Sequence, residues 1–158
     1  MGNIFAVSEI VEIGIQIEKN GKDFYNALSN RLDNAKIRDV FKYLAGEEEK
    51  HIVVFQKILG GIEKYEPVES FPGENLSYIN ALASEYIFTK KDKGVEAAKN
   101  LKTDKEAVDK GVEFEKDSIV FYEGMKKLIP DYDIKVIEEL IKQEQSHLLQ
   151  LLELKSKL

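Results

Sequence analysis

Two Glu-x-x-His motifs are the residues of this sequence best suited to chemistry. They are Glu48 with His51 and Glu144 with His147, and these are the only two histidines among the 158 residues. In an α-helix, positions three apart lie on one face, so each motif can direct a carboxylate and an imidazole at the same point. Carboxylate and imidazole ligands without thiolate suit iron or manganese, and they also accept zinc.

Both motifs belong to an internal repeat. The first copy contains GIQIEKNGKDFY at residues 14–25, and the second contains GVEFEKDSIVFY at residues 111–122. Each copy therefore places one glutamate, Glu18 or Glu115, ahead of its Glu-x-x-His motif. A lone motif of this kind is weak evidence, but two copies in register favour a common site.

The charges of such a site would balance. Four carboxylates carry the charge that two divalent cations neutralise, and a carboxylate inside a helical bundle is costly unless something neutralises it. We therefore predict two bound metal ions, bridged by Glu48 and Glu144. Glu18 and Glu115 would be terminal ligands, and each ion would take one histidine.

Tyr25 and Tyr122 lie seven residues after Glu18 and Glu115, which is about two helical turns. Two readings stay open for these tyrosines. They can be core residues, or their phenols can bond a ligand carboxylate or lie near a bound oxidant.

Composition excludes several classes of protein. The length fits one domain spanning 1–158, and the absence of cysteine excludes disulfides and the usual iron–sulfur clusters. A net charge of -6 argues against nucleic-acid binding. The apolar runs are too short to span a membrane, and the first residues do not resemble a signal peptide, so we expect a cytoplasmic protein.

Apolar residues at three- and four-residue spacing predict helices at about 8–30, 35–59, 76–88, 104–128 and 134–157. Possible helix caps are Ser8, Asp33 or Asn34, Gly60-Gly61, Thr103 with Glu106, and Asp131 or Asp133. Two antiparallel helix pairs joined by a long crossover are the ferritin-like form of the four-helix bundle. We therefore expect an all-α fold. The crossover, residues 63–102, could be a site cover, a dimer surface or a connector.

The repeat and its six candidate ligands resemble the rubrerythrin branch of the ferritin-like superfamily. The resemblance covers essentially all of the four long helices. It implies a di-iron site formed by Glu18, Glu48, His51, Glu115, Glu144 and His147.

The chain also departs from that branch at two points. It has no cysteine for the rubredoxin-like domain that rubrerythrins add. Rubrerythrins also carry an extra carboxylate one turn from the third-helix ligand, whereas here the neighbouring positions include Ser118 and Ile119.

These observations lead to three functional hypotheses. The first is a non-haem di-iron oxidoreductase, of peroxidase or ferroxidase type, that reduces hydrogen peroxide or dioxygen with electrons from an external donor. The second is an iron-binding or storage protein, and the third is a ferritin-like scaffold without redox activity. A homodimer is the expected assembly.

Overall fold

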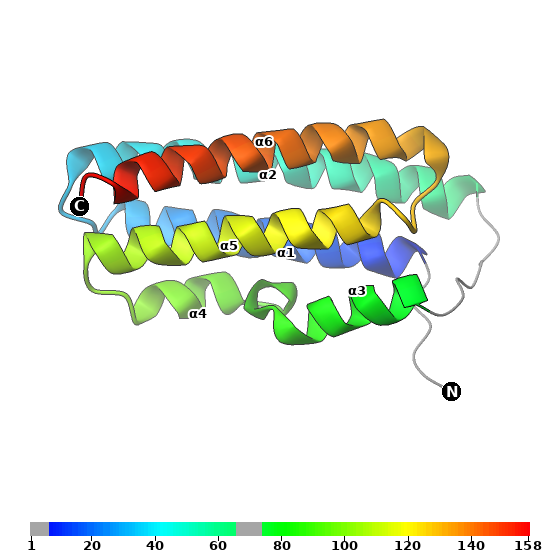
Figure 1. The fold of residues 1–158 in the computed structure, drawn as a ribbon, viewed down its shortest axis with the longest axis horizontal. Helices are drawn as coiled ribbons and strands as arrows, with labels where there is room; N and C mark the ends of the chain where they lie inside the picture. Colours follow the sequence, from blue (N-terminus) through cyan, green and yellow to red (C-terminus); the bar gives the residue numbers. More distant parts are fainter. Residues whose placement is uncertain (1–6, 66–73) are drawn as a thin grey trace.

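Four long helices form a bundle, and a segment of shorter helices lies along one side of it (Figure 1). The computed structural model describes residues 7–65 and 74–158. Its elements are α1 (Val7–Ser29), α2 (Ala35–Tyr65), α3 (Glu74–Glu85), a 3-10 turn η1 (Ile87–Thr89), α4 (Lys93–Lys99), α5 (Asp104–Met125) and α6 (Asp131–Lys155). No strand occurs in these two ranges, which confirms the expected all-α class.

Two of the predicted helix starts are formed by the expected side chains. The side-chain oxygen Oδ1 of Asn34 accepts from the backbone N–H groups of Lys36 and Ile37, at 2.9 and 3.2 Å. Thr103 Oγ1 accepts from the Glu106 backbone N–H at 3.1 Å. All three bonds satisfy N–H groups that the first turn of a helix leaves without a partner.

The capping residues predicted for the other two long helices were wrong. Helix α1 already begins at Val7, so Ser8 lies inside its first turn. Pro130 occupies the cap position of α6, which places Asp131 and Asp133 in the first turn. Their carboxylates lie near the positive end of the helix dipole there.

Helix α2 does not end at Gly60-Gly61 as predicted but continues to Tyr65. A side chain at either glycine would meet nothing within 4 Å. Ile58 and Ile62 are both buried, one turn apart, so the apolar face of the helix continues past the glycines. Burial of that face outweighs the helix cost of glycine, which is about 1 kcal/mol per residue.

The later helices also differ from the predicted bounds. The predicted helix at 76–88 is α3 followed by the separate turn η1, and α4 occupies part of the lysine-rich stretch after it. Helix α5 ends at Met125, and hydrogen-bonded turns carry the chain from there to Leu128.

The crossover is fixed to α1 by two polar side chains. Asn20, which is fully buried, donates to the carbonyls of Phe88 and Lys90, both at 2.6 Å, and accepts from the Gly94 N–H at 3.1 Å. A Cβ atom at Gly94 would lie 2.0 Å from the backbone carbonyl oxygen of Asn20, so only glycine fits there. Further along, Arg31 donates to two carbonyls at the end of α4 and just beyond it.

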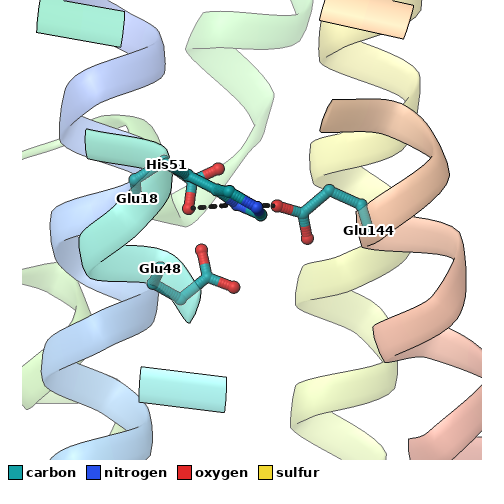
Figure 2. Close-up of side chains that lie close together, drawn as sticks. All are labelled: Glu18, Glu48, His51 and Glu144. Carbon is teal, nitrogen blue, oxygen red and sulfur yellow. Dashed lines mark ion pairs between the residues drawn. The ribbon is translucent and has the colours of Figure 1, made fainter. Parts of the chain in front are cut away.

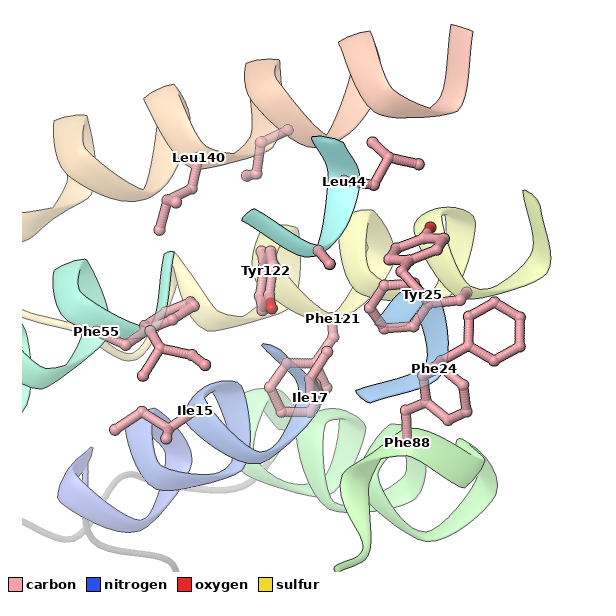
Figure 3. Packing of buried hydrophobic residues seen from close by; sticks show 14 of the residues in the cluster. Ile15, Ile17, Phe24, Tyr25, Leu44, Phe55, Phe88, Phe121, Tyr122 and Leu140 are labelled. Atoms are coloured by element: carbon pink, nitrogen blue, oxygen red, sulfur yellow. The ribbon is translucent and has the colours of Figure 1, made fainter. Parts of the chain in front are cut away.

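The core between the helices is rich in aromatic side chains (Figure 3). Tyr25 packs edge-on against Phe24 and Phe41, and Tyr122 packs against Phe55. Phe88 from the crossover reaches Phe114 of α5, with ring centroids 4.7 Å apart. Among the described helices, none combines the length and the apolar character that crossing a bilayer requires.

Candidate metal centre

The interior of the bundle contains six ionisable side chains from its four long helices. All six are at most 2% exposed: Glu18 of α1, Glu48 and His51 of α2, Glu115 of α5, and Glu144 and His147 of α6. The structure thus brings together every residue that the sequence predicts as a ligand. Ordinary helical cores exclude such groups because burying a charge is costly.

One half of the cluster surrounds His51 (Figure 2). Its Nδ1 atom lies 2.8 Å from Glu144 Oε1 and 3.4 Å from Glu18 Oε2. One ligand atom each from Glu18, Glu48, His51 and Glu144 lie within 4.8 Å of one another. One cation can therefore contact all four residues.

The other half surrounds His147. Its Nδ1 atom lies 3.6 Å from Glu144 Oε2, 3.8 Å from Glu48 Oε1 and 3.9 Å from Glu115 Oε1. These four residues form a second group within 4.8 Å. The two groups share Glu48 and Glu144, and these are the residues that the sequence predicts as bridges.

The donor chemistry fits cations better than it fits the apolar core around it. When all four carboxylates are ionised, six of their oxygens face no hydrogen-bond donor other than the imidazoles. They are Oε2 of Glu18, Oε2 of Glu115, and both oxygens of Glu48 and of Glu144. Buried acceptors are normally satisfied, so the described residues leave this cluster short of positive charge.

Protons can supply part of that charge in the metal-free protein. Burial, followed by the charge of Glu144, raises the pKa of Glu18 to about 8 and that of Glu115 well above 4.5. Burial alone would lower the pKa of His51, but Glu18 and Glu144 raise it to about 11. Protonated Glu18, Glu115 and His51 therefore compensate for the negative charge, and cations would displace these protons.

The two buried tyrosines bond the terminal glutamates crosswise. Tyr25 of α1 donates to Glu115 Oε1 on α5 at 2.7 Å, and Tyr122 of α5 donates to Glu18 Oε1 on α1 at 2.6 Å. Each tyrosine thus contacts the glutamate of the other repeat, whereas the sequence pattern groups each with the glutamate of its own copy. The two readings of these tyrosines are compatible, because both side chains are also part of the core.

Several neighbouring polar residues lie outside the cluster. Glu47 bonds Tyr43 and Lys50, Glu49 pairs with Lys22 at 2.6 Å, and Glu113 pairs with Lys110. The hydroxyl of Ser118, one turn after Glu115, donates to the Phe114 carbonyl.

Sequence reasoning missed Gln143. Its Oε1 atom lies 2.7 Å from Nε2 of His51. Its place directly before Glu144 was the only available signal.

A cleft of about 350 Å³ lies between the crossover and α5. Its walls include Ile17 and Phe114, which directly precede Glu18 and Glu115. These two residues and Phe88 of the crossover form an apolar part of the lining of the cleft.

Comparison with known proteins agrees with this geometry. Residues 9–155 match the family model described as Rubrerythrin. A crystal structure of a candidate ferritin-like diiron-carboxylate protein from Thermotoga maritima is similar, with 30% sequence identity and a TM-score of 0.69. The match covers 99% of this chain and 98% of that one. No curated protein matches the chain.

Proposed function

Because the chain belongs to the rubrerythrin family, we propose that it is a non-haem di-iron oxidoreductase that reduces hydrogen peroxide or dioxygen. One observation carries the proposal. Two groups of buried ligand atoms overlap at Glu48 and Glu144, which is the arrangement that holds two cations at bridged positions. When bound there, two ferrous ions supply two electrons, which reduce one hydrogen peroxide to water or one dioxygen to hydrogen peroxide.

The side chains of this chain would each have a defined task. Glu48 and Glu144 would bridge the cations, because each belongs to both groups. The Tyr122 hydroxyl holds one oxygen of Glu18 and leaves Oε2 free to face a cation. Tyr25 does the same for Glu115.

Two features of the chain bear on how a bound di-iron centre would react: its burial and the source of its electrons. The buried aromatic core around the site limits access of water. The chain has no cysteine to hold a further iron centre, so we propose that electrons come from an external donor. A homodimer is part of the same proposal.

Metal analysis and rapid kinetics test this function. Protein purified without chelators should contain two irons per chain, and manganese or zinc in their place would redirect the assignment. The anaerobic diferrous protein is then mixed with hydrogen peroxide in a stopped-flow instrument. We expect rapid oxidation in the wild type and in the exposed control Glu49→Ala.

The Glu48→Ala variant, which lacks a bridging carboxylate, should oxidise much more slowly. Equal rates in Glu48→Ala and the wild type would refute the proposed chemistry. A protein that reacts only with dioxygen and retains the ferric product would instead be a ferroxidase.

A further inference from the structure

His51 has a different neighbour on each of its two ring nitrogens. Nδ1 faces Glu144 and Glu18 inside the cluster, whereas Nε2 meets Gln143 Oε1 at 2.7 Å. A carbonyl oxygen only accepts, so Nε2 must carry the hydrogen. In the neutral ring this leaves the lone pair on Nδ1, directed into the cluster. Gln143 thus selects the tautomer that can bind a cation.

The repeat indicates where the corresponding residue of the other half lies. Replacing Glu18, Glu48 and His51 by Glu115, Glu144 and His147, and the reverse, converts each ligand group into the other. The crossed tyrosine bonds obey the same exchange. Gln143 directly precedes Glu144, so its counterpart is Glu47, which directly precedes Glu48.

Glu47 is linked to His147 through one intervening side chain, Tyr43. Its side chain is 18% exposed and is held by the Tyr43 hydroxyl at 2.7 Å and by Lys50 at 3.0 Å. The Tyr43 ring packs edge-on against the His147 ring at 6.2 Å. The counterpart of the Gln143 amide is therefore the Glu47 carboxyl group, which is linked to His147 through the Tyr43 ring.

We infer that Gln143 is a positioning residue for His51, and that the exchange of glutamine for glutamate makes the two cation positions unequal. The inference rests on the proposed function, because it assumes that the cluster binds two cations. A nearby carboxylate adds attraction for a cation, whereas a neutral amide only orients the ring. The position at His147 therefore binds the first cation, and the position at His51 binds the second more weakly.

Calorimetric titration of the chelator-stripped, full-length protein with Zn²⁺ tests the inference. The wild type should bind two ions with different affinities. Gln143→Leu should weaken the second event about tenfold, the lower end of the effect typical of such outer partners, and leave the first unchanged. Gln145→Leu is the matched control, since Gln145 is an exposed glutamine on the other side of Glu144.

Two charge variants test the asymmetry. Gln143→Glu should strengthen the second event, and Glu47→Gln should weaken the first, so that either change brings the two affinities closer together. Glu49→Gln, at an exposed neighbouring site, should change neither. Nitrogen NMR of the zinc-loaded wild type should show the proton of His51 on Nε2.

The outcomes separate this inference from the proposed function. A wild type that takes up no cation would refute the proposed function itself. Two ions bound with equal affinity in the wild type, or affinities in Gln143→Leu within about twofold of the wild type, would overturn only the present inference. Unchanged thermal unfolding of the metal-free variants would show that the effects are local to the site.

Discussion

Replacing Glu48 by methionine should stabilise the metal-free protein. Glu48 is fully buried, and neither of its oxygens has a hydrogen-bond partner among the described residues. A buried polar group without a partner costs about 1–3 kcal/mol, and methionine has a similar volume without the charge. We therefore expect the free energy of unfolding to rise by about 3 kcal/mol, which for a chain of this size is about 6–12 °C in melting temperature.

Removing Glu48 should not leave another charge stranded. His147 keeps Glu144 and Glu115 as neighbours at 3.6 and 3.9 Å. The gain in stability should therefore not be offset by a newly unpaired imidazole. Added Zn²⁺ should stabilise the wild type strongly and Glu48→Met much less, because ligand binding stabilises only a folded state that can bind.

Urea unfolding of chelator-treated protein provides the measurement. Glu49→Met is the matched control, because Glu49 makes an exposed ion pair with Lys22 that should contribute no more than about 1 kcal/mol. A metal-free Glu48→Met variant that is less stable than the wild type would refute the reasoning. It would mean that the buried carboxylate serves the fold and not a cation.

Three other predictions follow from the described contacts. Asn20→Ala should lower the free energy of unfolding by about 3 kcal/mol, because it leaves two carbonyls and one N–H of the crossover without their partner. Thermal unfolding measures this loss, with the exposed Asn30→Ala as control, and an equal loss in both variants would contradict the prediction. The metal-free protein should lose stability as the pH rises from about 4.5 to 8, because folded Glu18 holds its proton up to about 8. His51, with its pKa raised to about 11, adds the same trend above pH 6.5; urea midpoints that rise over this range would contradict both. Tyr122→Phe should weaken Zn²⁺ binding about tenfold, because it frees the oxygen of Glu18 that the hydroxyl holds; calorimetry measures it, and unchanged affinities would contradict it.

The candidate site could be located from the sequence because its histidines are rare and its pattern of glutamate and histidine is repeated. Only two histidines occur, and each follows a glutamate at helical spacing within matching segments. A helical register then brings Glu48 and His51 to one point without knowledge of the tertiary fold. Binding of iron by these side chains and reduction of an oxidant by the bound iron are predictions.

Contacts between distant segments could not be predicted in the same way. The partners of Asn20 are backbone groups about 70 residues further along the chain, and every residue has such groups. The crossed tyrosine bonds depend on how the two helix pairs pack, which a pattern within one helix does not specify. The end of α2 was misplaced because glycine favours a helix terminus locally, whereas burial of Ile62 depends on neighbouring helices.

The division of ligands between the two halves has a mechanical consequence. Helices α1 and α2 pack closely against each other and form one helical hairpin, and α5 and α6 form a second. Contacts between the two hairpins are fewer. Each ligand group takes three residues from one hairpin and one from the other. In the proposed metal-bound protein, each cation would therefore link the two hairpins through its ligands. Removal of the cations by a chelator should therefore weaken the contacts between the two hairpins before either hairpin unfolds.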